Sequence, residues 1–139
     1  MSDTSMAHTK WDCTYHIVFI PKYRRKVLYG EVRQKLLVIM KRLCRNKGIE
    51  IVEGAMCIDH VHMSVRIPAK LSVAEFMGYL KGKSALMLFD ENPELRRRTG
   101  KDRTLWTRGY YVSTVGLNEE VIRNYIRSQE ESDQLADGK

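Results

Sequence analysis

The sequence predicts an α+β fold in a single domain, residues 1–139, and three observations support this prediction. Short β-branched or alternating segments are separated by segments whose apolar residues recur at helical spacing. Glycine, proline and capping residues lie between these segments, and we find no internal repeat or interdomain linker. The hydrophobic content of 43% is ordinary for a globular domain, so the chain can form one core.

The predicted elements follow in the order β-α-β-β-α-β-α. Gly48 is typical of the end of a first helix, and Ser72 with Glu75 forms a capping box for a second. Asn118 can cap the third. The first six elements match a ferredoxin-like split βαβ arrangement, an antiparallel sheet with helices on one face, followed by a C-terminal helix. Strands are expected at 11–20, 49–56, 60–67 and 105–115, helices at 31–47, 72–89 and 118–131, a basic loop at 92–103, and frayed tails at 1–9 and 132–139.

Two histidines share one face of the predicted strand at 60–67. Side chains alternate between the faces of a strand, so Val61 and Met63 point to the core, whereas His60 and His62 point away from it. Two imidazoles one pleat repeat apart can reach a single metal ion. The pair by itself is also compatible with two solvated histidines on a half-buried strand.

The last predicted helix carries a tyrosine and a glutamine on one face. Tyr125 and Gln129 are four residues apart and therefore lie one turn apart. A tyrosine hydroxyl can act as a nucleophile, and an amide oxygen can complete a two-histidine metal site. The alternative is that Tyr125 only packs with the apolar stripe that contains Val121, Ile122 and Ile126.

The chain is basic, with a formal net charge of +7 and a pI near 9.4, and its charge is clustered. Tyr23 lies inside one basic cluster and Trp106 follows another. Basic clusters with interleaved aromatic residues suit phosphate neutralisation and base stacking, although such clusters also occur as solvated loops. The candidate DNA-binding residues are Lys22, Arg24, Arg25, Lys26, Lys81, Lys83, Arg97, Arg98, Arg103 and Arg108.

Several classes of protein are disfavoured. No apolar run approaches the roughly 18 residues that span a bilayer, and the polar N-terminus lacks the apolar stretch of a signal peptide, so we expect a cytoplasmic protein without a membrane partner. Three widely spaced cysteines indicate reduced thiols. The segment 78–84 lacks the P-loop spacing and lies in a predicted helix, so no nucleotide cofactor is expected. Zinc is disfavoured because strand parity places Cys57 on the face opposite His60.

Together these residues resemble the single-tyrosine HUH transposases of the insertion-sequence 200/605 group. His60-Val61-His62 is similar to the HUH motif (His, hydrophobic, His), and Tyr125 with Gln129 is similar to the tyrosine helix of that group. The resemblance covers nearly the whole chain, including the segments at 15–19, 22–28, 80–84 and 106–112.

The resemblance implies a metal-dependent enzyme that acts on single-stranded DNA and recognises hairpins at the ends of its element. His60, His62 and Gln129 would hold Mg²⁺ or Mn²⁺, and Tyr125 would form a 5′-phosphotyrosine before strand joining. It also implies a homodimer with active sites assembled in trans. The short joint at 116–117 can aim the tyrosine helix away from its own sheet.

Three other functions remain open from the sequence. A ferredoxin-like module could bind single-stranded RNA or DNA without catalysis, but it would need aromatic residues on the outward face, where histidines are expected. A phosphodiesterase with paired His-x-Ser/Thr motifs would need a second copy of His62-Met63-Ser64, which we do not find. A structural dimerisation protein would leave the basic clusters unexplained.

Overall fold

The computed structural model describes residues 5–6, 9–10, 14–99 and 104–137 and confirms the α+β class. Its first strands, β1 and β2, pair with each other in a small antiparallel sheet inside a segment predicted as a frayed tail. The elements are β1 (Ser5–Met6), β2 (Thr9–Lys10), β3 (Thr14–Phe19), the 3-10 turn η1 (Lys22–Arg24), α1 (Gly30–Asn46), β4 (Glu50–Cys57), β5 (His60–Arg66), α2 (Val73–Glu91), α3 (Pro93–Arg98), β6 (Tyr111–Ser113) and α4 (Glu119–Asp137).

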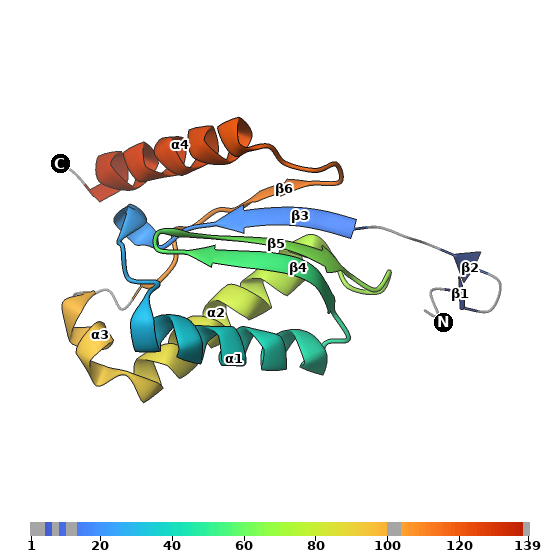
Figure 1. Ribbon diagram of the computed structural model, residues 1–139, viewed down its shortest axis with the longest axis horizontal. Coiled ribbons are helices and arrows are strands. Elements are labelled where there is room, and N and C mark those ends of the chain that lie inside the picture. The colour runs from blue at the N-terminus through green and yellow to red at the C-terminus, as the bar shows by residue number, and fades with distance from the viewer. Residues whose placement is uncertain (1–4, 7–8, 11–13, 100–103, 138–139) are drawn as a thin grey trace.

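The main sheet has the predicted ferredoxin-like topology. Its strand order is β4-β5-β3-β6, and each neighbouring pair is antiparallel. Helices α1 and α2 cover one face of this sheet, whereas α4 lies across the other face (Figure 1). The sheet therefore separates a conventional hydrophobic core from a second layer that is closed by the C-terminal helix.

The core between the sheet and α1 and α2 follows the predicted alternation. Ile17 pairs with Met63, and Phe19 pairs with Val61 across the β3–β5 ladder, so these four side chains share the core face. The ladder also fixes the opposite face, where Val18 lies directly across from His62. Packing of the core thus determines which way the histidines point.

The predicted basic loop at 92–103 contains a short helix, α3, that the sequence analysis missed. The Asn92 side chain accepts a hydrogen bond from Leu95 N, and Pro93 occupies the first turn. Leu95 is fully buried and anchors the helix to the core. The Asn-Pro start signal was present, but the arginines that follow it suggested a solvated loop; three arginines instead occupy the last turn, where they suit the helix dipole.

The predicted strand at 105–115 was too long. Only Tyr111–Ser113 joins the sheet, and Trp106 makes an isolated bridge to Pro21. The indole of Trp106 turns inward and donates a hydrogen bond to Ser84 Oγ (3.0 Å). The chain then bends at Arg108, and at Gly109 the backbone passes close to the side chains of Tyr125 and Gln129 on α4.

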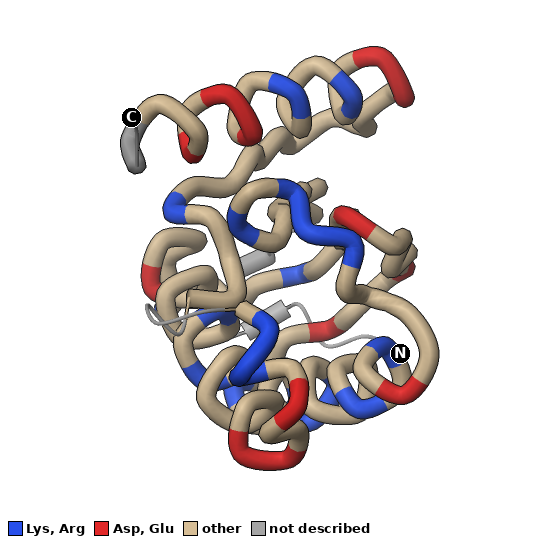
Figure 2. The backbone as a smooth tube through the Cα atoms, turned by 90° about the vertical axis from the view of Figure 1, so that its left-hand side faces the viewer, with Lys and Arg blue, Asp and Glu red and all other residues tan. Residues whose placement is uncertain are grey.

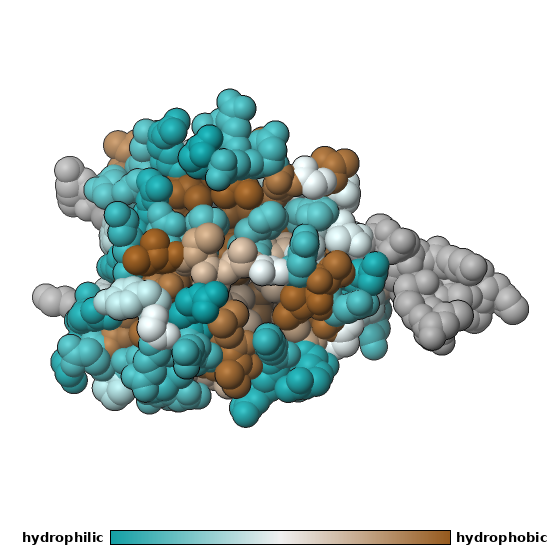
Figure 3. Space-filling model, in the orientation of Figure 1, coloured by the Kyte–Doolittle hydropathy of each residue, from teal (hydrophilic) through white to brown (hydrophobic). Residues whose placement is uncertain are grey.

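Helix α4 does not end near residue 131 as predicted but continues to Asp137, so most of the expected C-terminal tail is helical. The extension has a cause, because Asp133 is buried and hydrogen-bonded. Figure 3 shows hydrophobic side chains along the side of α4 that faces the sheet and hydrophilic ones on its outer side. Ile126 on α4 is only 3% exposed. In this single chain the helix lies over its own sheet, and its predicted placement on the sheet of a second chain stays a prediction.

Within the described residues, no helix is long and apolar enough to cross a membrane. The segment 78–84 lies inside α2, as predicted. Cys44 is buried and Cys57 is exposed, and both are free thiols. Cys13 lies outside the described residues.

Candidate active site

His62 lies on the outward face of β5, at the centre of the sheet. Its strand neighbours are Val18 on β3 and Ala55 on β4. Burial lowers the pKa of the imidazole, and nearby His16 and His60 would lower that pKa further if charged. His62 Nε2 is buried and has no hydrogen-bond partner among the described residues. A neutral imidazole with an unused nitrogen is in the chemical state that a metal ligand requires.

His60 is held by a carboxylate immediately before it in the chain. His60 Nδ1 lies 3.0 Å from Asp59 Oδ1, and Arg24 Nε donates to Asp59 Oδ2 at 2.8 Å. Desolvation alone would raise the pKa of Asp59, but the hydrogen bonds from His60 and Arg24 outweigh it and lower that pKa. The ionised carboxylate can only accept, so His60 Nδ1 carries the proton and Nε2 remains available as a ligand.

Tyr125 and Gln129 meet at Gly109. A Cβ placed on Gly109 would lie 3.6 Å from Gln129 Oε1 and 3.9 Å from Tyr125 Oη. The Tyr125 ring lies 5.7 Å from that of Tyr111 on β6, and its hydroxyl is buried without a described hydrogen-bond partner. Burial raises the pKa of Tyr125, and the charge of Asp133 raises it further. The tyrosine is therefore protonated at neutral pH in the free protein.

Two polar residues that the sequence did not point to individually lie next to Gln129: Thr107 contacts it, and Asp133 contacts Thr107. Thr107 Oγ1 lies 3.1 Å from Gln129 Oε1 and 2.7 Å from Asp133 Oδ1. The backbone N–H of Tyr23 donates to the other oxygen of Asp133 at 3.0 Å. Asp133 follows Gln129 by four residues, so helical spacing alone places it on the same side of α4 as the tyrosine. Thr107 carried no local signal, because only the fold brings it to this helix.

Arg24 connects the two halves of the site. In addition to its bond with Asp59, its Nη1 lies 3.4 Å from Glu130 Oε1 on α4. One guanidinium thus joins the residue that orients His60 to the helix that carries Tyr125. Arg24 was also predicted to contact DNA; its side chain makes these two intramolecular contacts and is 38% exposed.

The other predicted DNA-binding residues differ in exposure and in the contacts that they make within the protein. Lys22 and Arg25 lie over the ring of Tyr23, at 5.3 and 5.0 Å from its centroid, and the basic run that contains them passes directly beneath α4 (Figure 2). Arg25 also donates to the carbonyl oxygen of Thr104, and Arg97 pairs with Glu94. Exposed side chains are those of Lys26, Lys83, Arg97, Arg98 and Arg108, whereas Arg103 lies outside the described residues.

Lys81 holds the backbone segment that lies next to Tyr125 and Gln129. Its ammonium donates to the carbonyl oxygens of Arg108 and Gly109, each at 2.9 Å. Burial lowers the pKa of Lys81 to about 8, although the charge of Asp133 acts in the opposite direction. These bonds hold the backbone at Arg108 and Gly109 next to Tyr125, and the predicted contact of Lys81 with phosphate stays a prediction.

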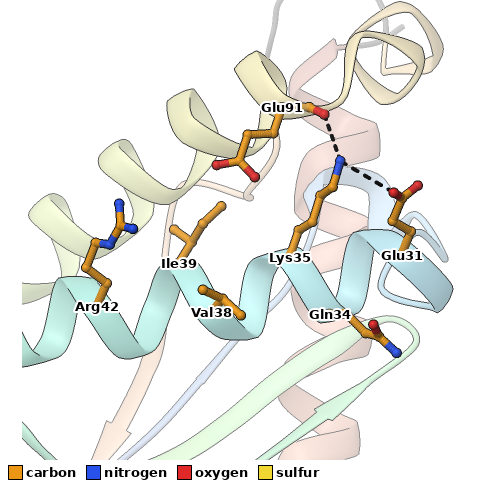
Figure 4. A pocket seen from close by; sticks show the side chains of 7 residues that line it. All are labelled: Glu31, Gln34, Lys35, Val38, Ile39, Arg42 and Glu91. Atoms are coloured by element: carbon orange, nitrogen blue, oxygen red, sulfur yellow. Dashed lines mark hydrogen bonds and ion pairs between the residues drawn. The ribbon is translucent and has the colours of Figure 1, made fainter.

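A pocket of about 220 Å³ opens beside His62 along β4 and is lined by Glu53, Gly54, Ala55, His62, Met63 and Ser64. A larger groove of about 380 Å³ lies elsewhere, between α1 and α2 (Figure 4). There Lys35 donates to the carbonyl oxygen of Glu91 and pairs with Glu31. Since its lysine is already paired and no candidate catalytic residue lines it, this groove does not compete with the histidine face.

The zinc alternative fails for a reason that differs from the expected one. Cys57 is paired directly with His60 across the β4–β5 hairpin, so the two lie on the same face and the parity argument was wrong. Even so, no three His, Cys, Asp or Glu side chains in the described part of the chain are grouped to hold a metal ion.

The ferredoxin-like sheet carries two histidines on its outward face, and the helix that covers this face carries Tyr125, which is the arrangement expected of a single-tyrosine transposase. The family described as "Transposase IS200 like" matches residues 9–129, and the chain belongs to this family. Transposition of DNA is therefore the process in which it acts.

Relatives and solved structures agree with this assignment. The chain is 49% identical over 135 residues to the transposase for insertion sequence element IS200 of Salmonella typhimurium, covering 97% of this chain and 88% of the relative. It is 32% identical over 120 residues to the ISDra2 transposase TnpA of Deinococcus radiodurans, covering 86% and 85%.

A transposase crystal structure from Deinococcus radiodurans superposes with a TM-score of 0.79 at 28% identity, over 89% of this chain and 95% of that chain. A REP-associated tyrosine transposase bound to a REP hairpin shares the fold alone, with a TM-score of 0.55 at 14% identity over 87% of this chain and 68% of that chain.

Proposed function

We propose that this transposase cuts and rejoins single-stranded DNA, with Tyr125 as the nucleophile and a divalent metal ion at His60 and His62. The observation that carries the proposal is a pair of buried atoms without described partners, His62 Nε2 and Tyr125 Oη. A buried polar atom without a partner costs about 1–3 kcal/mol, and a bound ion, substrate or ordered water at that atom removes this cost. His62 lies on the outward face of β5, and Tyr125 Oη lies beside Gly109 on the helix that covers this face.

The residues present fit a hard divalent ion. His60 offers Nε2 because Asp59 holds its other nitrogen, His62 offers an unused nitrogen, and Gln129 offers an amide oxygen. Nitrogen and oxygen donors of this kind suit Mg²⁺ or Mn²⁺. When bound, the ion would polarise the scissile phosphate and offset developing negative charge.

Tyr125 would form a bond between Oη and the phosphorus while the bond from phosphorus to the 3′-oxygen breaks. The released strand takes up a proton and ends in a 3′-hydroxyl, while the tyrosine loses one, so protons balance. The downstream strand remains on the protein as a 5′-phosphotyrosine. Attack by the 3′-hydroxyl of another strand reverses the step and joins DNA without ATP, because the phosphotyrosine conserves the bond energy.

The hairpin-bound structure of the REP-associated transposase supports a folded single strand as the substrate. A non-catalytic binding module is less compatible with this geometry, because stacking bases would need an open aromatic platform on the sheet. Here histidines occupy the outward face of the central strand β5, and α4 covers that face.

An adduct assay tests the proposal. Single-stranded oligonucleotides from both flanks of the chain's own gene are labelled at the 3′ end, incubated with protein and Mg²⁺, and run on a denaturing gel. We expect the 3′ label to migrate with the protein and a 5′-end label to be released on a shorter strand. Duplex DNA of the same sequence is the control. Label transfer that does not depend on metal, or transfer of the 5′ label, would contradict the proposed chemistry.

We also propose a homodimer in which α4 of one chain closes the site of the other. In the single chain, Asp133 and Glu130 of α4 contact Tyr23 and Arg24 in η1 and Thr107 in the segment before β6. The segment 114–118 joins β6 to this helix. An exchange of α4 between two chains would preserve all of these contacts, since it changes only which chain supplies the helix.

Mixing two inactive variants should restore cleavage if the sites assemble in trans. Tyr125→Phe chains retain the histidines, and His60→Ala/His62→Ala chains retain the tyrosine. A mixed dimer assembled in trans contains one complete site of two, so cleavage should recover to up to half the wild-type level per mixed dimer. Mixed dimers, verified by two affinity tags, that remain inactive would show that each site forms within one chain.

The exposed arginines of α3 should contribute to DNA binding through phosphate contacts. Replacing Arg97 and Arg98 with Ala should weaken binding and reduce the slope of log affinity against log salt by roughly 0.7–0.9 for each lost contact. Arg24 is unsuitable for this test, because its loss would also release Asp59 and Glu130. An unchanged affinity and slope, measured by fluorescence anisotropy, would mean that these arginines are only solvated.

A further inference from the structure

Thr107 and Asp133 form a buried polar pair next to Gln129. Thr107 is 1% exposed and Asp133 is 8% exposed, and neither is needed to hold a metal or to attack DNA in the proposed function. Both oxygens of Asp133 are in use, one with the Thr107 hydroxyl and the other with the N–H of Tyr23. When every buried polar group has a hydrogen-bond partner, the side chains are held in one orientation, because any other arrangement leaves a donor or acceptor unpaired.

The backbone conformation at Tyr23 indicates that the contact with Asp133 is fixed by the surrounding structure. Tyr23 and Arg24 have φ values of 61° and 55°, in the left-handed region that residues with a side chain rarely adopt. Strain of this kind persists only where surrounding contacts impose it. Here it aims the N–H of Tyr23 at Asp133 and the guanidinium of Arg24 at Asp59 and Glu130.

The protons of this cluster determine the direction of its hydrogen bonds. The Thr107 hydroxyl has one proton, and the carboxylate of Asp133, at 2.7 Å, can only accept it. The atom of Gln129 that lies 3.1 Å from the same hydroxyl oxygen must then be a donor. The amide nitrogen is the donor in that side chain, and the two ends of an amide have nearly the same shape. Rotating the amide therefore satisfies the cluster and frees the amide oxygen.

We propose that Thr107 and Asp133 are positioning residues that orient the Gln129 amide, with its nitrogen on Thr107 and its oxygen available to the metal. This inference rests on the proposed metal site. The hydrogen bonds run from Gln129 Nε2 to Thr107 Oγ1 and from Thr107 to Asp133. Without the carboxylate at the end of this chain, the hydroxyl proton is free to bond the amide oxygen, which would then be occupied by Thr107 instead of the metal.

Mn²⁺ binding to the DNA-free protein, followed by electron paramagnetic resonance, tests this inference. Thr107→Val keeps the size of the side chain but removes the hydroxyl, and it should weaken Mn²⁺ binding by roughly 10- to 100-fold, as is usual when the partner of a metal ligand is lost. Asp133→Asn should act in the same direction, because its amide can donate to Thr107 and reverse the chain. Thr107→Ser should retain binding. Thermal unfolding of each variant checks that it is folded.

Repeating the Thr107→Val measurement in a protein that carries a different residue at position 129 separates loss of amide orientation from a general effect on the structure. Gln129→Glu offers an oxygen at both ends, so the direction of the hydrogen bond no longer matters. Thr107→Val should then change Mn²⁺ affinity by less than about twofold in the Glu background while retaining its full effect with Gln129. Equal losses in both backgrounds, or no loss in either, would overturn the inference. His62→Ala distinguishes a failure of this inference from a failure of the proposed metal site. If His62→Ala leaves Mn²⁺ binding intact, the proposed metal site itself is wrong.

Discussion

Replacing Tyr125 with Phe should abolish both DNA cleavage and the covalent adduct. The substitution removes only the attacking oxygen and keeps the ring that packs against Tyr111. DNA affinity should stay within about twofold, since it rests mainly on contacts to phosphates. Because the lost hydroxyl is buried without a described partner, the thermal midpoint should remain the same or rise slightly.

Tyr29→Phe is the matched control for that variant. It makes the same chemical change on an exposed residue beside α1, away from α4, and should leave cleavage unchanged. Denaturing gels give the adduct and fluorescence anisotropy gives the affinity. A Tyr125→Phe protein that still forms an adduct would assign the nucleophile to another residue.

Replacing His62 with Ala should lower the cleavage rate by several orders of magnitude, because the metal loses one of its proposed protein ligands. The folded state should survive, since no described hydrogen bond involves the His62 ring. EDTA should reproduce the loss in the wild-type protein, and Mg²⁺ or Mn²⁺ should reverse it.

His16 provides the comparison for this variant. Its ring lies 6.5 Å from that of His62 on the same face, but its Nδ1 is paired with Ser64 Oγ at 2.8 Å. His16→Gln should therefore reduce cleavage far less than His62→Ala. Full cleavage in EDTA, or a His16 variant as defective as the His62 variant, would contradict the assigned ligands.

Local patterns predicted the parts of the site that lie on one strand or one helix. Alternation along β5 placed His60 and His62 on the outward face, and helical spacing placed Tyr125 and Gln129 together. The resemblance to a known group added the metal and the DNA substrate. These features depend on neighbours within a few residues, which a sequence displays directly.

What the sequence did not reveal depends on tertiary contacts. Thr107 reaches α4 only through the path of the chain before β6, and Arg24 reaches Asp59 and Glu130 from the strained turn η1. The face of Cys57 was misassigned because the β4–β5 turn resets the parity between strands. Helix α3 was missed because Leu95, its one buried apolar residue, lies among charged residues in the sequence.

Identification of the residue joined to DNA tests the central claim most directly. The adduct formed with Mg²⁺ is digested with nuclease and protease, and the modified peptide is sequenced by tandem mass spectrometry. We predict a nucleotide attached through its 5′-phosphate to Tyr125, present only when metal is supplied. A nucleotide on Tyr110, Tyr111 or any other residue, or an attachment through a 3′-phosphate, would contradict the account.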